Sequence, residues 1–540
     1  MRGLMQEQPL VISSLIEHAA RSHPEREIVS RSPEGLVRTN YGAVSERARR
    51  LAAALQRMGI DRGERVATLA WNDHRHMELY YAVSGMGAVL HTINPRLFAE
   101  QVEYIVNHAE DRIIFFAPGF APLLEKLGPR LPTVRAFVAM CPREHMPDAD
   151  LPDLLCYEDL LDIQPVDWPE VEENAAATLC YTSGTTGDPK GVLYSHRSTV
   201  LHAFAACGVD GLGVGSADTA LLVVPMFHVN AWGMPYAGAM SGAKLVLPGP
   251  ALDGASVYAL LRDEKVTLAL GVPTVWLMLF RHVDEQRLAP QRELVLQRCI
   301  IGGSAAPQAM IERFEQDFGC EAIQAWGMTE LSPLGTVSRL RPEHAALPPE
   351  ARRQIQLKQG RAVFGVRMKI VDDEGRELPR DGASAGLLKV KGPWVAGSYY
   401  GCGHATDADG WFDTGDVATI DAEGYMQITD RAKDVIKSGG EWISSIDLEN
   451  AAMGHPAVAE AAVIGLHHPQ WQERPLLVVV RKQGQALERE EMLAFLVGKV
   501  AKWWLPDDVA FVDSLPHTAT GKLQKATLRR QFGHYRWPEI

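Results

Sequence analysis

The sequence predicts an α/β protein in which a large N-terminal region of helix-covered sheets, with a smaller β-rich subdomain, is hinged to a small α+β C-terminal domain. Three observations lead to this prediction. The chain has 540 residues, too many for one compact core. Short apolar runs alternate with helical patterns through most of its length, which is typical of parallel sheets covered by helices. From about Gly360, turns rich in Gly and Asp separate the strand patterns, which indicates an antiparallel or barrel-like region.

Apolar periodicity predicts the helices and strands of the large region. One helical face is formed by Val44, Ala48, Leu51, Ala52 and Leu55. Gly59 can end this helix, and a second helix is predicted over 76–86. The predicted buried strands are 66–71, 89–93, 112–117, 134–140, 177–181, 220–224, 244–247, 266–270 and 299–301. In the β-rich part the predicted strands are 366–372 and 387–392.

The end of the chain has a pattern of its own. A helix is predicted after Ser445 and another over 488–500, with strands at 458–465, 476–480 and 509–512. This stretch is long enough for a small α+β domain. We therefore predict two domains, 1–429 and 430–540.

Charge and cysteine content exclude several classes of protein. The net charge of −13 argues against a nucleic-acid-binding surface, and an anionic ligand would need local positive charge or backbone N–H groups. The seven cysteines are scattered without a C-x-x-C pair, so reduced thiols are predicted, not a disulfide frame or a zinc site. Cys180, Cys207 and Cys299 lie in apolar runs and are predicted to pack in the core. Since the N-terminus does not resemble a signal peptide and no apolar run could span a membrane, we expect a cytoplasmic protein.

The stretch from Tyr181 to Gly191, YTSGTTGDPKG, has the composition of a phosphate-binding loop. It follows a predicted strand, and Ser195 beyond it can cap a helix. Its glycines permit a tight turn in which successive N–H groups form a nest for an anion. The spacing G-x-x-G-x-x-K-G is not that of a Walker A loop, which disfavours a P-loop NTPase. An exposed turn between strand and helix is the alternative interpretation.

This loop resembles the signature of the adenylate-forming enzymes, which include acyl-CoA synthetases, luciferases and peptide-synthetase adenylation domains. The other motifs of that superfamily follow in family order: PMFHVNAWG at 225–233, GVPTVW at 271–276, GGSAAP at 302–307, WGMTE at 326–330, WFDTGD at 411–416, DRAKDVIKSGGEWISS at 430–445 and TATGKLQK at 518–525. The N-terminal QPLVISSLIEHAA and the run HTINPRLFAEQ are most similar to bacterial medium- and long-chain fatty acid–CoA ligases, a group that includes ligases of 3-(methylthio)propionate.

The resemblance implies the reaction acid + ATP + CoA → acyl-CoA + AMP + pyrophosphate, with ATP, CoA and Mg²⁺ as cofactors. A carboxylate approaching an α-phosphate is repelled, so the first step requires a cation between them. The resemblance assigns this role to Lys522, although a lone Gly-Lys would ordinarily be an exposed loop residue. It assigns Mg²⁺ binding to Glu330 and Thr185, and α-phosphate contact to Thr329; Thr329 and Glu330 could also be a helix N-cap pair. The phosphate-binding residues it implies are Thr182, Ser183, Gly184, Thr185, Thr186, Gly187 and Lys190.

Other motifs are implied to bind the nucleoside. Asp416 can accept hydrogen bonds from both ribose hydroxyls, and Arg431 would assist at the ribose or phosphate. On local sequence alone, Asp416 could be a turn residue and Arg431 a surface ion-pair residue. The segments implied to line adenine contain Gly303, Ser304, Ala305, Trp326, Gly327 and Met328. The first three could equally form a tight turn after a strand.

The second step needs a thiol at the same carbonyl carbon, so one site must present two faces in turn. The resemblance places the pivot at Asp430. After rotation Lys522 would leave, and a new segment would line the pantetheine tunnel. That segment comprises Lys437, Ser438, Gly439, Gly440, Glu441 and Trp442. Trp442 could stack on adenine or pack in a domain interface.

The implied acid pocket contains His228, Trp232, Gly233, Gly302, Gly327, Met328 and Pro333. His228 and Trp232 are four apart and would share a face if the segment is helical; both could also be core residues. An apolar pocket discriminates weakly for each methylene. We expect an unbranched, mostly apolar monocarboxylic acid of short or medium chain, with 3-(methylthio)propionate a candidate. A long-chain fatty acid ligase and a non-CoA adenylating enzyme are the alternatives.

Three rival functions remain at this stage. A luciferase would need O₂ and a luciferin in its second step. An amino acid–activating domain usually carries a pocket Asp for the substrate ammonium, and the pocket candidates include none. A non-catalytic nucleotide-binding regulator would be expected to lose Lys522, Glu330 or Asp416, and none is lost. Relatives often form homodimers, so a homodimer is also expected.

Overall fold

The structure is a computed structural model that describes residues 1–540 except 2, 33–34, 183–187, 439–440, 518–522 and 538–540, and except the side chains of 441–442. The chain forms two compact units. The first contains Met1–Thr182, Asp188–Val366 and Lys391–Gly410, and the second contains residues 367–390 and 411–540. Each unit has its own sheets and cores.

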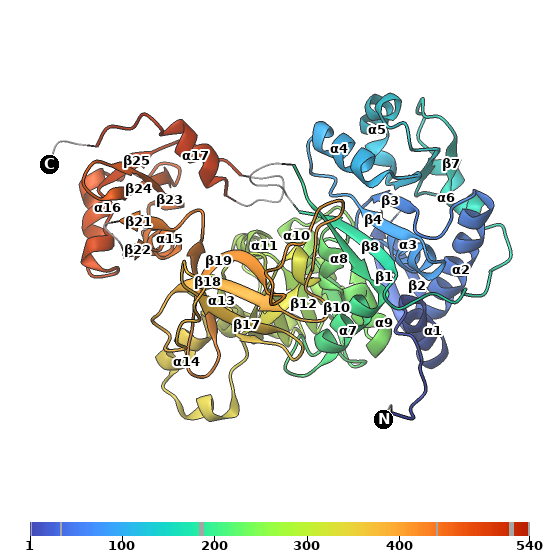
Figure 1. The fold of residues 1–540 in the computed structure, drawn as a ribbon, viewed down its shortest axis with the longest axis horizontal. Helices are drawn as coiled ribbons and strands as arrows, with labels where there is room; N and C mark the ends of the chain where they lie inside the picture. Colours follow the sequence, from blue (N-terminus) through green and yellow to red (C-terminus); the bar gives the residue numbers. More distant parts are fainter. Residues whose placement is uncertain (2, 33–34, 183–187, 439–440, 518–522, 538–540) are drawn as a thin grey trace. The chain divides into compact units, whose positions relative to one another are not determined.

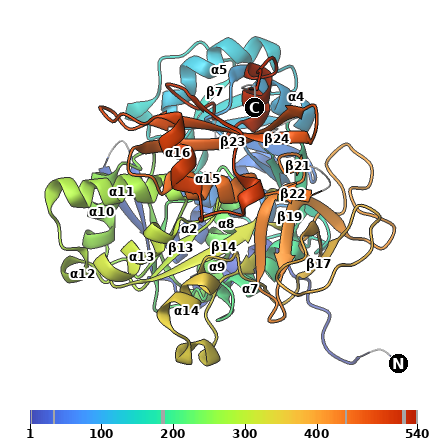
Figure 2. The same ribbon diagram turned by 90° about the vertical axis from the view of Figure 1, so that its left-hand side faces the viewer.

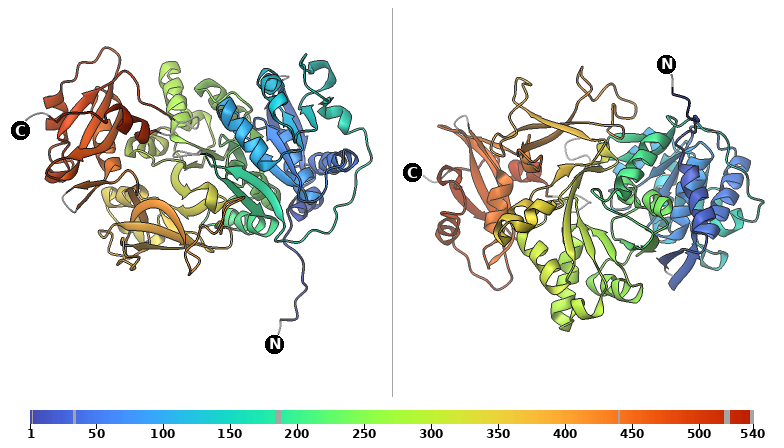
Figure 3. Two further views of the ribbon diagram at one scale, coloured as in Figure 1. Left: turned by 45° about the horizontal axis from the view of Figure 1, so that its top comes forward. Right: turned by 90° about the horizontal axis from the view of Figure 1, so that it is seen from below.

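The first unit is built on two large sheets. The nine-stranded sheet has the order β16 (Arg361–Ala362), β15 (Leu334–Val337), β14 (Glu321–Gly327), β13 (Arg298–Ile301), β12 (Leu268–Gly271), β10 (Thr219–Leu222), β11 (Lys244–Leu247), β1 (Glu27–Ser32) and β2 (Gly35–Asn40). The seven-stranded sheet has the order β7 (Leu154–Cys156), β6 (Ala136–Ala139), β5 (Ile113–Phe116), β3 (Arg65–Leu69), β4 (Val89–Thr92), β8 (Ala176–Tyr181) and β9 (Gly191–Ser195). In both views of Figure 3 the green elements lie beside the blue and cyan ones.

Helices separate and cover these sheets. The helices of this unit are α1 (Ile12–Ser22), α2 (Tyr41–Arg57), α3 (His74–Gly85), α4 (Ala99–Ala109), α5 (Ala121–Leu127), α6 (Tyr157–Leu160), α7 (His196–Cys207), α8 (Val229–Trp232), α9 (Met234–Ser241), α10 (Gly254–Asp263), α11 (Pro273–Gln286), α12 (Pro290–Glu293), α13 (Gln308–Asp317) and α14 (Pro349–Gln356).

Successive side chains of a strand point to opposite faces of the sheet, so each face packs against a different set of helices. Leu245 and Leu247 of β11 enter a core with α1, α2, α3, α7 and α9, whereas Val246 enters a core with α10, α11 and α13. Figure 2 shows α10, α11 and α13 grouped beside β13. In β5, Ile113 joins the first of these cores and Ile114 joins another with α4 and α5. The two sheets therefore share one central helical layer, and each has a second helical layer on its far face.

The second unit contains two smaller sheets. The four-stranded sheet has the order β17 (Arg367–Val371), β18 (Gly386–Lys391), β19 (Phe412–Ile420) and β20 (Met426–Arg431). The five-stranded sheet has the order β22 (Glu441–Ile443), β21 (Ile436–Ser438), β24 (Gln472–Arg481) and β23 (Val458–His468), with β25 (Asp508–Phe511) also paired to β24. Its helices are α15 (Ser445–Met453), α16 (Arg489–Leu496) and α17 (Lys525–Gln531). Leu477 of β24 faces α15 and α16, and Leu476 faces α17, so helices cover both sides of this sheet (Figure 1).

These observations confirm the predicted fold class and correct it in two places. The antiparallel strand β9 stands between the phosphate-loop segment and α7, where a helix was expected to follow directly. Strands β2, β15 and β16 add antiparallel edges to the predicted parallel sheet. The antiparallel character predicted beyond Gly360 is confirmed by the pairing of β18, β19 and β20. The boundary at residue 430 stays a prediction; the compact units divide elsewhere, because β17 to β19 are grouped with the C-terminal sheet.

The cysteines are free thiols, as predicted. Cys180 and Cys299 are buried and Cys207 is partly buried. Burial raises the pKa of Cys180 to about 11, which makes it an inert core thiol. Among the described residues, no helix combines the length and apolar character needed to cross a membrane.

Candidate active site

The two ends of the phosphate-loop segment are fixed to each other. The N–H of Thr182 donates to the carbonyl of Lys190 at 2.9 Å, and the N–H of Lys190 donates to Thr182 Oγ1 at 3.2 Å. Beyond this neck, β8 and β9 pair antiparallel, with Tyr181 opposite Gly191. Ser195 caps α7 as predicted, its side chain accepting from the N–H of Ser198. Ser183, Gly184, Thr185, Thr186 and Gly187 lie outside the described residues.

Glu330 lies in a short 3-10 helix (Thr329–Leu331) after β14 and is 6% exposed. Its carboxylate Oε1 accepts from the hydroxyl of Tyr399 at 2.7 Å, and its carbonyl accepts from the N–H of Ala396 at 2.8 Å. The carbonyl of the preceding Thr329 accepts from Tyr194 Oη at 2.6 Å. The N-cap of this helix is Met328, without a side-chain cap, so Thr329 and Glu330 are not an N-cap pair.

Tyr399 connects the glutamate to the loop. Lys190 Nζ lies over its ring, 4.9 Å from the centroid. Burial and the Glu330 carboxylate both raise the pKa of the Tyr399 hydroxyl, which keeps it a neutral donor. The neighbouring Tyr400 donates its N–H to the carbonyl of Gly191 at 2.8 Å. The sequence analysis missed Tyr399, because no local pattern connects it to Glu330, from which it is separated by 69 positions.

Several predicted pocket residues lie in contact. A side chain at Gly302 would come within 2.7 Å of the Trp232 ring, so this glycine leaves the space that the indole fills. A side chain at Gly327 would collide with the carbonyl oxygen of Pro333. The glycines are therefore required by close approach of neighbouring groups. The structure thus brings two pairs of the predicted pocket together, Trp232 with Gly302 and Gly327 with Pro333.

The segment that carries Trp232 is not the right-handed helix on which the shared face with His228 depended. Val229, Asn230, Ala231 and Trp232 all have φ between 47° and 56°, in the left-handed region. Each such residue costs roughly 1–2 kcal/mol, so the surroundings must hold the turn in place. Asn230 supplies part of this support: its Nδ2 donates to Thr178 Oγ1 at 3.1 Å, and its Oδ1 accepts from Tyr80 Oη at 3.3 Å. Backbone strain of this kind is concentrated at functional sites.

The residues implied to line adenine form two segments. Gly303, with φ 84°, Ser304 and Ala305 make an exposed bend after β13, so the tight turn considered above is present. Trp326 lies in β14 and is 8% exposed, and a side chain at Gly335 would come within 2.5 Å of its ring. Exposure of the bend leaves its backbone accessible to a ligand.

In the second unit, Asp416 and Arg431 lie opposite each other on β19 and β20. Arg431 Nε is 2.9 Å from Asp416 Oδ1, and the Asp416 carboxylate is almost fully buried. Asp416 is therefore a strand residue, not a turn residue, and Arg431 is paired with it. The carboxylate and the guanidinium thus form an ion pair across two neighbouring strands.

Asp430 is also buried, and it connects β20 to α15. Its carboxylate accepts from the N–H of Ser445 at 2.6 Å and from the N–H of Arg431 at 2.7 Å. Burial raises the pKa of Asp430, and the positive charge of Lys525 opposes the shift. Lys525 Nζ itself donates to Ser445 Oγ at 2.5 Å and pairs with Glu449 at 2.7 Å. The predicted hinge residue is thus anchored on both sides; its role as a pivot stays a prediction.

The implied pantetheine segment forms the β21–β22 hairpin. Lys437 is exposed, and Arg474 donates to the buried Ser438 Oγ at 3.3 Å. Gly439 and Gly440, the side chains of Glu441 and Trp442, and the predicted adenylation lysine, Lys522, lie outside what the structure describes.

Comparison with known proteins identifies the family. Residues 16–400 match the AMP-binding enzyme family, and residues 447–522 match the AMP-binding enzyme C-terminal domain. The chain belongs to the AMP-binding enzyme family. It is 53% identical to a 3-methylmercaptopropionyl-CoA ligase of Ruegeria pomeroyi, covering 98% of this chain and 99% of that protein. It is 51% identical to a medium-chain-fatty-acid–CoA ligase of Ectopseudomonas oleovorans, covering 99% and 98%.

Solved structures agree on the fold of this AMP-binding enzyme. The anthranilate CoA ligase AuaEII in complex with anthranoyl-AMP superposes with a TM-score of 0.83 at 24% identity, covering 98% of this chain and 99% of that chain. The predicted superfamily and the predicted enzyme class, an AMP-forming acid–CoA ligase, are thereby confirmed.

Proposed function

We propose that this AMP-binding enzyme converts a short- or medium-chain aliphatic acid into its CoA thioester through an acyl-adenylate, with 3-(methylthio)propionate as a candidate substrate. One observation carries the proposal: Tyr399 contacts both the Glu330 carboxylate and the Lys190 ammonium at the neck of the loop. One side chain thus contacts both a carboxylate, which suits a metal ion, and an ammonium group, which suits a phosphate. The names of the relatives support the substrate class.

In the first step, a carboxylate oxygen of the acid attacks the α-phosphorus of ATP, and the bond to the β-phosphate oxygen breaks to release pyrophosphate. Lys522 would supply the cation that offsets their repulsion. Lys190 and the backbone N–H groups of the loop bind the phosphates. Asp416 accepts from the ribose hydroxyls, with Arg431 beside it.

In the second step, the CoA sulfur attacks the acyl carbon, the bond from that carbon to the AMP oxygen breaks, and the thiol proton passes to solvent. Lys522 is no longer needed, and the chain turning about Asp430 presents the 437–442 hairpin instead. The sequence has glycines at 439 and 440, which carry no side chain that could obstruct the thin pantetheine arm.

The residues present suit Mg²⁺. This ion takes one or two protein carboxylates and keeps phosphate oxygens and waters as its other ligands. Glu330 would hold it, with Thr185, and Tyr399 fixes the Glu330 carboxylate in one orientation. When bound, the ion neutralises charge on the phosphates. We also propose a homodimer and a cytoplasmic location, the second supported by free cysteine thiols.

A CoA-consumption screen tests the proposal. The purified protein is supplied with ATP, Mg²⁺ and CoA, and with straight-chain acids of increasing length, aromatic acids or 3-(methylthio)propionate; free thiol and pyrophosphate are followed together. We expect acid-dependent pyrophosphate release and thiol loss, greatest with short and medium acids. Turnover without CoA would indicate another adenylating enzyme, and activity only with long acids would favour a long-chain ligase, the activity that a Thermus thermophilus relative at 47% identity has by name.

A further inference from the structure

His202 lies behind the strained turn that carries Trp232 and Gly233. It lies midway along α7, is 1% exposed, and packs edge-on against Trp394 with ring centroids 6.0 Å apart. Burial lowers the pKa of His202 to about 3, so the ring is neutral at ordinary pH. Because the imidazole is fully buried and stays neutral, its shape and position do not change with pH.

The hydrogen bonding of His202 defines which way the ring faces. Its Nε2 accepts from the backbone N–H of Leu334 at 3.2 Å. Since a backbone amide can only donate, Nε2 is unprotonated and Nδ1 carries the hydrogen. Leu334 directly follows Pro333, and its carbonyl accepts from Trp394 Nε1 at 3.0 Å. His202 and Trp394 therefore fix the backbone next to one predicted pocket residue.

The other edge of the ring meets Gly233. A Cβ built there would lie 2.6 Å from His202 Nδ1 and 2.7 Å from its Cε1. Gly233 has φ 74°, in the left-handed region, so both its conformation and its lack of side chain suit this position. The imidazole thus lies against Gly233 and is hydrogen-bonded to Leu334, the residue after Pro333.

We propose that His202 is a specificity-determining residue that closes the acid pocket behind Gly233 and so limits the acids to short tails. This inference rests on the proposed function, because it takes Trp232, Gly233 and Pro333 as the walls of the acid site. A rigid ring cannot move aside for added methylenes without loss of the Leu334 hydrogen bond. The sequence offered no sign of this role, since His202 is 132 positions from Leu334.

Truncation of His202 tests the inference. In His202→Ala the ring is replaced by a methyl group, which leaves space that extra methylenes can occupy. One methylene in an apolar pocket changes kcat/KM by about 10- to 200-fold. We expect the ratio of kcat/KM for octanoate over butanoate to rise at least about 10-fold relative to the wild type.

The same helix provides a matched control. His196 begins α7, is also 1% exposed, and its Nδ1 accepts from the N–H of Ile12 at 3.2 Å, so it supports α1 instead of the pocket. His196→Ala removes the same atoms from a buried site and should leave the octanoate-to-butanoate ratio at the wild-type value. If His202→Ala does not fold, His202→Asn removes less volume and should shift the ratio in the same direction.

The outcomes separate the two proposals. A wild type that activates aliphatic acids, with an unchanged ratio in the folded His202 variant, overturns the inference and leaves the proposed function standing. An equal shift in His196→Ala also overturns it, because the effect would then follow from loosened packing in general. A wild type that activates no aliphatic acid overturns the proposed function itself.

Discussion

Four buried histidines of the first unit remain neutral in the folded protein. Burial lowers the pKa to about 3 for His74 and His202, and to about 4 for His76 and His196. The ordinary value, 6.5, applies to the unfolded chain. Below pH 6.5, these histidines therefore bind protons in the unfolded chain but not in the folded protein. The contribution of the neutral histidines to the stability of the folded protein is fully present above pH 6.5 and is lost as the pH falls towards 4.

His76 allows a test of this linkage. Its Nε2 lies 2.9 Å from Thr68 Oγ1, and its Nδ1 lies 3.0 Å from the Trp71 carbonyl. Between pH 6 and 5, the free energy of unfolding of the wild type should fall by up to about 1.4 kcal/mol per pH unit more steeply than that of His76→Asn. Urea denaturation at several pH values measures both slopes. Parallel slopes would show that His76 does not resist protonation.

Glu330 is the predicted Mg²⁺ ligand, and its carboxylate is also buried. In Glu330→Gln the shape and the contact with Tyr399 are kept, but the negative charge is lost. We expect acid-dependent pyrophosphate release to fall by about 10- to 100-fold and to recover in part at high Mg²⁺. Glu350→Gln, an exposed position of α14, serves as the control. Equal Mg²⁺ dependence in both variants would remove Glu330 from the metal site.

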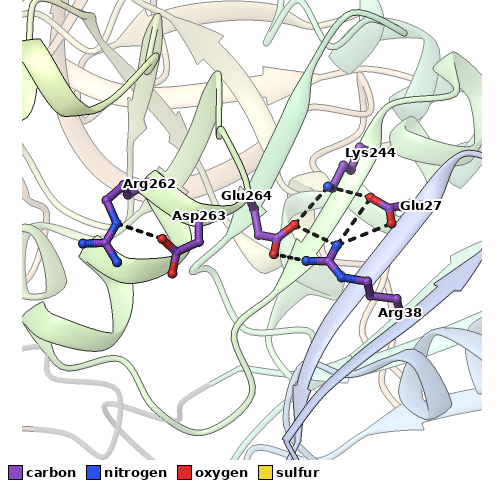
Figure 4. Close-up of polar contacts among 6 residues, drawn as sticks. All are labelled: Glu27, Arg38, Lys244, Arg262, Asp263 and Glu264. Carbon is purple, nitrogen blue, oxygen red and sulfur yellow. Dashed lines mark hydrogen bonds and ion pairs between the residues drawn. The ribbon is translucent and has the colours of Figure 1, made fainter.

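At the scale of elements, an ion-pair network joins three strands and a helix end at one side of the nine-stranded sheet (Figure 4). Glu264, at the C-cap of α10, is 2% exposed and pairs with Arg38 at 2.6 Å and with Lys244 at 2.9 Å. Glu27 of β1 also contacts both cations, at 3.4 Å and 2.7 Å. The first and last strands of the sheet segment β11–β1–β2 are thus tied to α10.

Glu264→Ala and Asp263→Ala form a matched pair of adjacent substitutions. Loss of Glu264 removes three charge-assisted hydrogen bonds, two from Arg38 and one from Lys244, at a buried carboxylate. We expect the free energy of unfolding to fall by about 1–3 kcal/mol. Asp263 pairs with Arg262 across an exposed contact, where the side chains are 57% and 51% exposed, so its loss should cost at most about 1 kcal/mol. Denaturant titration at low and high salt compares them. Equal losses would show that burial of Glu264 adds nothing.

At the scale of the whole molecule, the two half-reactions should require different parts of the chain. In Lys522→Ala, acid-dependent pyrophosphate release should fall by at least about 100-fold, because the cation between the reacting anions is gone. Thioester formation from a supplied acyl-adenylate should stay within a few-fold of the wild type. Single-turnover assays of each half-reaction measure both. Equal loss in the two steps would contradict the predicted exchange of Lys522 for the hairpin.

Most of the strands could be predicted from apolar runs, because a strand buried on both faces leaves a continuous apolar signal. Strand β11 begins and ends at the predicted residues, Lys244 and Leu247. Strand β9 was missed because it is an edge strand with an exposed Leu193 and follows a glycine-rich loop. The turn at 229–232 was misjudged because spacing of four predicts a shared face only for a right-handed helix.

From the sequence alone, the resemblance of its motifs indicated the family and the enzyme class and predicted roles for Lys522, Glu330 and Asp416, because such motifs depend on residue types at short spacing. The tertiary structure alone decided that two sheets share a helical layer, that Tyr399 holds Glu330 and that His202 backs Gly233. These contacts join residues 31 to 132 positions apart. Such pairs depend on the path of the whole chain, since local propensity gives no information on which distant segments meet.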